Sequence, residues 1–308
     1  MNKLPVYCDF SYLQNFFSVL SRTTLDPYGD SSRLKDMLDF KDILLSRATL
    51  LTDKTDEEID ALCISDELMR ILKKKSVSGG SDLIACKDKL DKIKSVGNND
   101  CILHNEPSSL YCLNVDQAIA NNIASQYGVI CLGRGCFLES SKYRKDPVVL
   151  EIGDDFSWWK ILSSDIPSQF VVIHDNYLIE NVTIDNSLNL KSILRQLVHN
   201  SFKGIYNLYI LHFIEDQTKL KHKQEIIKEI VHASSLNCKV NIKFIKGRKE
   251  NLHDRDILTN YLWIHSGHAT DIERNRKSTK DTSLHFTDLF NSTDSFLAIQ
   301  KKVLKKLK

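Results

Sequence analysis

The chain has 308 residues, of which 42% are hydrophobic and 27% charged, so it is long enough for two average domains with ordinary cores. A formal net charge of only +2 excludes a polycation, so any affinity for nucleic acid has to come from a local basic patch. The apolar runs are too short for a signal peptide or a membrane span, and we expect a cytoplasmic protein without a transmembrane segment.

The first half of the chain alternates between strand and helix patterns. Apolar residues predict a short strand followed by a helix over 5–20, helical patterns over 34–51 and 53–75, and a charged helix over 83–104. Residues 108–135 indicate a strand, a helix that stops at Gly128, a second strand and a glycine-rich loop. Strands that alternate with helices predict a parallel sheet in an α/β domain.

The second half begins with a stretch that mixes charges and prolines and is typical of a domain boundary. Beyond it, apolar periodicity predicts a strand near 170, a helix over 188–200, a strand over 206–214, a helix over 219–235 and a strand over 238–247. The chain ends in a short basic amphipathic helix. The sequence therefore predicts an α/β domain over 1–140, a boundary over 141–168, a second α/β domain over 169–275 and a tail with a basic helix over 276–308.

One segment of the second domain carries residues suited to phosphate chemistry. The segment covers residues 253–267, and its first, third, eighth and fifteenth positions are His253, Arg255, Asn260 and Gly267. This is the spacing of the phospholipase D motif. Residues two apart on a strand share a face, so a histidine and a cation converge on one phosphate. We predict that His253 is the nucleophile and that all four residues bind phosphate, the glycine by letting the return strand pass closely.

The motif departs from the enzyme pattern at three positions. Arg255 replaces the usual lysine, Asn260 replaces the usual aspartate, and His268 replaces the usual serine. Asparagine lacks the negative charge that orients an imidazole, so the phosphate-binding half of the motif is better preserved than the catalytic half. Residues 170–271 resemble the C-terminal phospholipase D-like domain of MIT-domain proteins, through HDNYLIEN at 174–181 and HDRDILTN with WIHSGHATDI at 253–272. The resemblance implies a phospholipase D-like half-domain that binds phosphate-bearing surfaces without catalysis.

Two other interpretations of this segment stay open. Phospholipase D-type enzymes use two facing histidine motifs, so an active site built from one motif requires a homodimer that contributes His253 twice. Alternatively, His253, Asp254 and Arg255 form a hydrogen-bonded lock for a hairpin and bind nothing.

Two acids of the first domain follow predicted strands. Asp9 stands in VYCDFSYL and Asp116 in LNVDQAIANN, an arrangement that resembles a PIN-type nuclease domain. The resemblance implies that both acids hold Mg²⁺ or Mn²⁺ beside a scissile phosphate, because hard cations prefer oxygen ligands. The third acid is open among Asp42, Asp66 and Glu67. Asp9 and Asp116 also suit helix N-caps, which is the structural alternative.

Three functional hypotheses follow. The first is a metal-dependent nuclease of a prokaryotic antiviral defence system, with metal at Asp9 and Asp116 and phosphate recognition by the second domain. The second is a non-catalytic module that binds nucleic acid or another phosphate-bearing partner. The third is a dimeric phospholipase D-type phosphodiesterase that uses His253.

Overall fold

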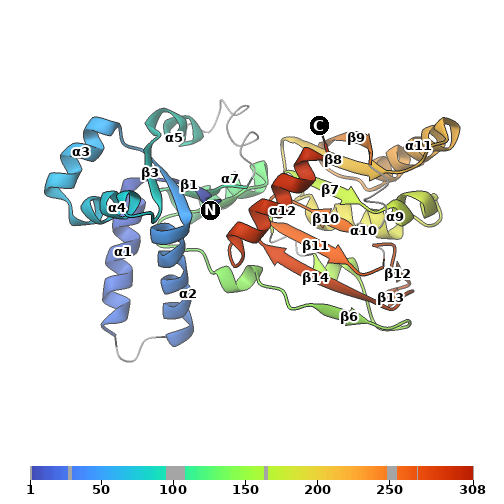
Figure 1. The fold of residues 1–308 in the computed structure, drawn as a ribbon, viewed down its shortest axis with the longest axis horizontal. Coiled ribbons are helices and arrows are strands. Elements are labelled where there is room, and N and C mark those ends of the chain that lie inside the picture. The colour runs from blue at the N-terminus through green and yellow to red at the C-terminus, as the bar shows by residue number, and fades with distance from the viewer. Residues whose placement is uncertain are drawn as a thin grey trace. The chain divides into compact units, whose positions relative to one another are not determined.

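The chain forms two compact α/β units, shown in Figure 1. The computed structural model describes residues 2–26, 30–94, 108–162, 166–247, 255–268 and 270–307. Unit 1 comprises Met1–Ala124, Val129–Tyr143 and Leu289–Asp294, and unit 2 comprises Ser125–Gly128, Arg144–Asp288 and Ser295–Lys308. The predicted fold class, two α/β domains of which the first has a parallel sheet, is confirmed.

Unit 1 is built on a parallel five-stranded sheet with the order β3-β2-β1-β4-β5. Its strands are β1 (Leu4–Cys8), β2 (Ala48–Thr52), β3 (Asp82–Ala85), β4 (Leu110–Cys112) and β5 (Ile130–Leu132). The chain moves from β1 to β2 and β3 on one side, and β4 and β5 then add on the other side. The strand order therefore reverses between β1 and β4, which is where open α/β sheets bind ligands, beyond the carboxyl ends of the strands.

The helices of unit 1 follow local sequence signals. They are α1 (Phe10–Thr24), α2 (Ser31–Asp42), a π-helical turn (Ile43–Arg47), α3 (Asp56–Ser65), α4 (Glu67–Val77), α5 (Lys87–Lys94), α7 (Gln117–Tyr127) and a 3-10 turn (Ser140–Tyr143). Helix α3 begins with a capping box in which the Thr55 and Glu58 side chains each accept the other's backbone N–H. The predicted stop at Gly128 is confirmed, since this glycine follows α7 with φ +63°.

Two helix predictions in unit 1 were too long. The pattern over 34–51 ends as helix at Arg47, and the next five residues form β2, in which buried and half-buried side chains alternate. The pattern over 83–104 begins inside β3 instead of a helix. In both places the spacing of leucine and isoleucine residues is compatible with a helix as well as with a strand. Pairing with a neighbouring strand makes the segment a strand.

Unit 2 is built on a mixed seven-stranded sheet with the order β6-β14-β11-β10-β7-β8-β9. Strands β7 (Phe170–His174), β8 (Ile205–His212) and β9 (Lys239–Lys246) are parallel to one another. Strands β10 (Asp256–Leu258), β11 (Leu262–Ser266), β14 (Thr282–Asp288) and β6 (Val148–Leu150) extend the sheet with antiparallel pairs. The predicted order of strands and helices, closed by a hairpin, is confirmed.

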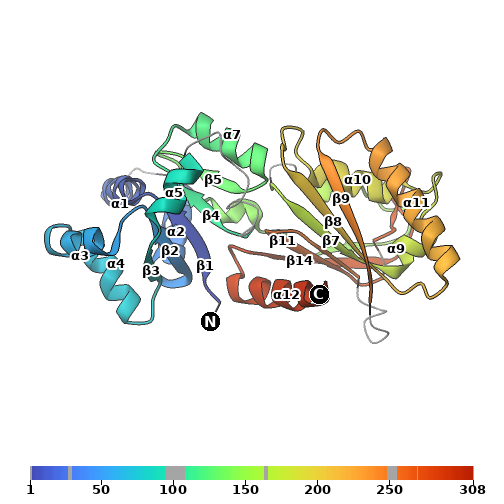
Figure 2. The ribbon, with the colours of Figure 1, turned by 90° about the horizontal axis from the view of Figure 1, so that it is seen from above.

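Helices lie on both faces of the unit 2 sheet, as Figure 2 shows. On one side lie α9 (Asn176–Asn181), α10 (Leu188–Leu197) and α11 (Gln217–Ala233), and on the other side lies α12 (Thr293–Lys305). A short helix α8 (Trp158–Ile161) and a small hairpin of β12 (Glu273–Arg274) and β13 (Lys277–Ser278) complete the unit. The strands are buried where they face helices, with Ile173, Ile257 and Ile264 at most 1% exposed.

The predicted domain boundaries need correction. The expected boundary over 141–168 contains β6, which pairs with β14, and the fully buried Trp158. The expected tail over 276–308 contains β14, which is an interior strand of the unit 2 sheet. Both segments mix charged and apolar residues without a regular period, so their place in the sheet depends on long-range pairing that local patterns do not show.

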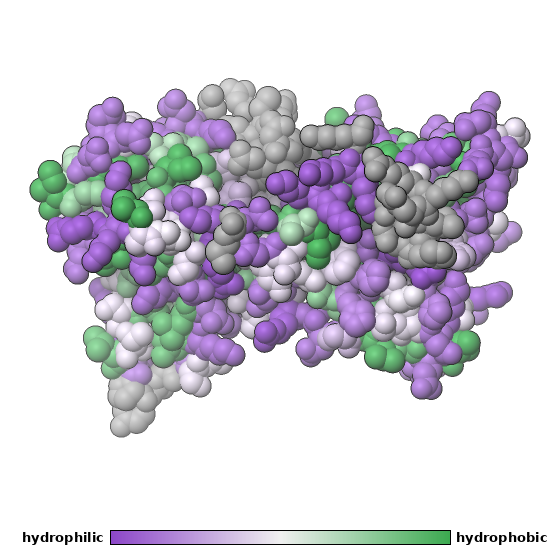
Figure 3. Space-filling model, viewed as in Figure 1, coloured by the Kyte–Doolittle hydropathy of each residue, from purple (hydrophilic) through white to green (hydrophobic). Residues whose placement is uncertain are grey.

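Hydrophilic side chains predominate on the face of the molecule that Figure 3 shows, with hydrophobic side chains scattered among them. Among the described residues, no helix combines the length and the apolar character needed to cross a membrane.

Candidate functional site

Four polar side chains stand in one row across the sheet of unit 2. In register, His174 of β7 is opposite Asp256 of β10, Asp256 is opposite His265 of β11, and His265 is opposite His285 of β14. Residues directly opposite each other in antiparallel strands point to the same face. These four residues, called the histidine row below, therefore lie side by side on one face of the sheet.

Asp256 organises the row. Its Oδ1 lies 2.9 Å from Nδ1 of His265, and its Oδ2 lies 3.8 Å from Nδ1 of His174, which is longer than a hydrogen bond. Burial raises the pKa of Asp256, but the hydrogen bond from His265 and the electrostatic attraction of both neighbouring histidines outweigh it and lower the pKa to about 2. The carboxylate is therefore ionised and only accepts, so Nδ1 of His265 carries a proton and the lone pair of the neutral ring is on Nε2.

Exposure increases along the row. His174 is fully buried and stacks on Phe213 with ring centroids 5.7 Å apart. The His265 side chain is 40% exposed and stacks on Trp263 at 5.5 Å, and His285 is exposed. The inner histidine belongs to the core, and the outer two are accessible to a ligand.

Arg255, a predicted phosphate ligand, immediately precedes Asp256 and so lies at the same end of the sheet as the row. Its Nη1 donates a 2.9 Å hydrogen bond to the Gly267 carbonyl, and its guanidinium lies 5.0 Å from the centre of the Tyr177 ring. The bond to Gly267 ties β10 to the end of β11, which supports the hairpin-lock interpretation for this residue. Further N–H groups of the guanidinium are left for a ligand, because arginine has five.

Gly267 lies at the end of β11, where the backbone comes close to Ser283 of β14. Its N–H donates to Ser283 O of β14 at 2.9 Å, and a Cβ added here would lie 3.1 Å from Ser283 Oγ. A direct contact of this glycine with phosphate stays a prediction.

The predicted phosphate contact of Asn260 is wrong. The side chain is fully buried, its Oδ1 accepts a hydrogen bond from Gln169 N at 3.1 Å, and its Nδ2 donates to Gly128 O at 3.0 Å. Both ends of the carboxamide hold backbone inside unit 2. The catalytic and phosphate-binding roles of His253, and the dimeric phospholipase D-type hypothesis that depends on it, stay predictions, because His253 and Asp254 lie outside the described residues.

The acids of unit 1 gather at the reversal point of its sheet. Asp9 follows β1, and its Oδ2 accepts a hydrogen bond from Asn114 N beyond β4 at 2.7 Å. Asp53 follows β2, and its Oδ1 accepts from Phe10 N, the first residue of α1, at 2.8 Å. Asp9 occupies the N-cap position of α1, but Asp53 supplies the side-chain bond there. The pKa of the Cys8 thiol is raised by burial first and then by the nearby charges of Asp53 and Asp9.

The other predicted acids have local roles or lie in solvent. Asp116 is exposed and directly precedes α7. Of the candidates for the third acid, Asp42 forms an ion pair with Arg47, Asp66 caps α4 by accepting from Met69 N, and Glu67 is exposed. Asp53 was missed as a candidate, because the helical interpretation of 34–51 concealed the strand that ends beside it.

Asp9 and Asp53 both lie at this edge, and Nζ of Lys54 is 3.6 Å from Oδ2 of Asp53. The described part of the chain contains no group of three or more His, Cys, Asp or Glu side chains arranged to hold a metal ion. Mg²⁺ commonly uses one or two protein carboxylates, with water and substrate phosphate completing its shell. The residues therefore fit Mg²⁺ or Mn²⁺ as a two-carboxylate site, without the predicted contribution of a third acid.

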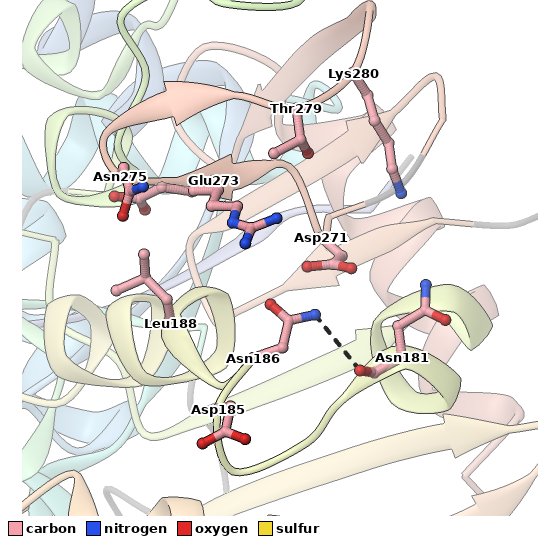
Figure 4. A pocket seen from close by; sticks show the side chains of 10 residues that line it. Asn181, Asp185, Asn186, Leu188, Asp271, Glu273, Asn275, Thr279 and Lys280 are labelled. Carbon is pink, nitrogen blue, oxygen red and sulfur yellow. Dashed lines mark hydrogen bonds between the residues drawn. The ribbon is translucent and has the colours of Figure 1, made fainter.

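Unit 2 also contains a polar cavity of about 640 Å³, shown in Figure 4. It lies between the end of α9, the start of α10 and the β12–β13 hairpin, and Asp271 and Lys280 both reach into it. Burial is the main cause that raises the pKa of Asp271. The lining contains three acids, Asp185, Asp271 and Glu273, against two bases, Arg274 and Lys280. Such a lining does not favour a polyanion, so the histidine row is the better candidate for phosphate.

Comparison with models of known protein families gives no match for this chain, and comparison with curated proteins gives none either.

Proposed function

We propose that this protein binds nucleic acid through phosphate groups, at the accessible end of the histidine row and Arg255. The observation that supports this function best is the direct register of His265 and His285 on one sheet face. Imidazole takes up a proton close to neutral pH and then attracts phosphate, while arginine is always charged. The three residues lie at the same end of the unit 2 sheet, in a chain whose net charge is only +2.

Trp263 favours nucleic acid over other phosphate-bearing partners. It is half-buried and shares a sheet face with His265, against which it stacks. Nucleic-acid bases stack on exposed aromatic surfaces, which contributes about 1–3 kcal/mol per base.

The test is fluorescence anisotropy of the purified full chain with labelled single-stranded RNA and single-stranded DNA, at pH 6 and low salt. The double variant His265→Ala/His285→Ala should bind at least about tenfold more weakly, since two charge-assisted contacts are lost. The control is His222→Ala, which removes an exposed histidine of α11. Unchanged affinity in the double variant contradicts the proposal, and binding to anionic vesicles alone would assign the row to membranes.

The metal-dependent nuclease is the second candidate, and it is supported by the meeting of Asp9 and Asp53 at the reversal point of unit 1. There, Asp9 and Asp53 would hold the ion, which when bound would neutralise phosphate charge and activate water. Arg134, whose Nε donates to Asn114 Oδ1 at 3.0 Å, would orient the Asn114 carboxamide beside them.

A metal-binding readout separates this candidate from the first. Isothermal titration with Mn²⁺ should give heat with the wild type that is lost in Asp9→Asn and Asp53→Asn and retained in Asp116→Asn. A wild type that binds no Mn²⁺ and cuts no nucleic acid in its presence removes the second candidate and leaves the first untouched.

A further inference from the structure

The accessible end of the histidine row has the composition of an acid–base pair. His265 and His285 are direct cross-strand neighbours, so their Cβ atoms lie about 4.5–5.5 Å apart. Two imidazoles at this separation flank one phosphate group from the same side of the sheet. Their surroundings differ, because His265 has an ionised carboxylate behind it and His285 is open to solvent.

This difference assigns the two roles. Asp256 accepts the Nδ1–H of His265, holds the ring in one tautomer and stabilises the imidazolium that forms when Nε2 takes a proton. His265 is therefore suited to act as the base. His285 is exposed and stands on β14, two strands away from Asp256, so it is assigned the role of the acid.

We propose that His265 and His285 cleave single-stranded RNA by transesterification without a metal ion, with Asp256 as the positioning residue. The proposal rests on the nucleic-acid binding proposed above and names its substrate class as RNA, because the reaction needs a 2′-hydroxyl. Nε2 of His265 removes the proton of the 2′-hydroxyl, and the 2′-oxygen bonds to the adjacent phosphorus.

The bond from phosphorus to the 5′-oxygen then breaks, and His285 gives its proton to that oxygen. The products are a 2′,3′-cyclic phosphate end and a 5′-hydroxyl end. His265 finishes protonated and His285 neutral, so one proton has moved between the two rings through the substrate, and no oxidant, water or cofactor is consumed.

Other parts of the row support this assignment. His174 is fully buried on the far side of Asp256, so the carboxylate lies between a core imidazole and the accessible one and is 10% exposed. Trp263 stacks on the face of His265 and limits the rotation of its ring.

The experiment uses the full chain with an end-labelled single-stranded RNA, in the presence of EDTA so that a metal site in unit 1 is silent. Wild type should cut the RNA and leave 2′,3′-cyclic phosphate ends, identified by mass spectrometry. His265→Ala and His285→Ala should each slow cutting by about 10²–10⁴-fold, the usual contribution of one acid or base. His222→Ala, purified in the same way, should cut at the wild-type rate.

One further substrate and three further variants keep the possible failures distinct. The same strand with 2′-deoxy sugars should bind but stay intact, so binding without cutting of either strand overturns this inference and leaves the proposed function standing. If the wild-type protein binds neither strand, both this inference and the proposed nucleic-acid binding are overturned. Asp256→Asn should lower kcat with little change in KM, because it leaves the wrong tautomer at His265. An equal effect on kcat and KM would show a merely structural role for Asp256. Folded His265→Gln and His285→Gln variants that cut normally would also overturn the inference.

Discussion

At the scale of single residues, Asp256 links the stability of unit 2 to pH. Its pKa falls from an ordinary 3.8 to about 2, so its contribution is complete above pH 3.8 and is lost as the pH falls through 2. Each pKa unit corresponds to about 1.4 kcal/mol, so Asp256→Asn should cost on the order of 2 kcal/mol at neutral pH. Urea unfolding across pH 2–7 measures this, and the gap between wild type and variant should close at the acid end.

The matched control for this measurement is Asp185→Asn, which neutralises an exposed carboxylate in the same unit. It should leave the unfolding free energy within about 0.5 kcal/mol of wild type at every pH. If Asp256→Asn follows the control, the carboxylate is not ionised between its two histidines.

Asn189 is a second residue on which unit 2 depends. It is 1% exposed, its Oδ1 accepts from Trp158 Nε1 at 3.0 Å and Glu273 N at 2.8 Å, and its Nδ2 donates to Asp271 Oδ1 at 2.8 Å. Asn189→Ala leaves buried donors unpaired, so we expect a loss of about 3 kcal/mol in chemical denaturation.

The comparison for Asn189 is Asn186→Ala, which truncates an exposed asparagine at the rim of the cavity in Figure 4. That change should cost less than about 0.5 kcal/mol. Equal effects of the two substitutions would mean that the buried hydrogen bonds around Asn189 add nothing to stability.

At the scale of elements, the end of α7 depends on the absence of a side chain at Gly128. Its φ is +63°, and an added Cβ would lie 2.2 Å from Ser168 O, a backbone atom that cannot yield easily. Gly128→Ala should therefore cost well over 2 kcal/mol, of which about 1 kcal/mol is the left-handed conformation itself. Gly153 has φ +95°, and a Cβ added there would have no atom within 4 Å. Gly153→Ala therefore measures the cost of the backbone conformation alone, without a steric clash.

Thermal unfolding of the two glycine variants side by side makes the comparison. The melting temperature of Gly128→Ala should fall clearly below that of Gly153→Ala. Similar melting temperatures would show that the chain near Ser168 adjusts at little cost, and that the contact does not fix this part of unit 2.

Local sequence patterns predicted most elements, and the failures have one physical cause. The strand and helix pattern at 108–135 and the strands predicted near 170, over 206–214 and over 238–247 came out as expected because their apolar periodicity is strong. Strand β2 was taken for helix because leucines at 44, 45, 50 and 51 fit either spacing, and the pairing with β1 decides between them. Because the end of β2 was not recognised, Asp53, which follows it, was not considered as a site residue. An error in one element can therefore hide a site residue.

The candidate site was harder to predict than the elements because it is a product of register. His174 and His285 are more than a hundred positions apart in the chain, and nothing local relates them. Only the pairing of β7, β10, β11 and β14 puts them in one row. The motif spacing selected the β10–β11 hairpin and Arg255, whose phosphate contact stays a prediction, and it also chose Asn260, whose side chain is buried in the core.

At the scale of the whole molecule, the chain divides into units that are not continuous in sequence. Unit 2 takes Ser125–Gly128 from the middle of the first half, and unit 1 takes Leu289–Asp294 from near the end. A linear scan for boundaries finds composition changes, but not short segments that pack with a distant part of the chain. This is why β14 was assigned to a tail although it is flanked on both sides by strands of its sheet.

The small net charge of the whole molecule makes the salt dependence of binding a sharp test of where nucleic acid binds. If three groups, Arg255, His265 and His285, contact phosphates at pH 6, log affinity should fall against log salt with a slope of about −2, since single strands give about −0.7 per contact. Arg255→Ala should reduce the slope by about 0.7 and leave RNA and DNA equally affected, because a phosphate contact carries no sequence information. Anisotropy titrations at four salt concentrations measure both slopes. A steep slope that Arg255→Ala leaves unchanged would place the phosphate contacts on another part of the chain, and a slope near zero would mean that stacking on Trp263, and not charge, holds the strand.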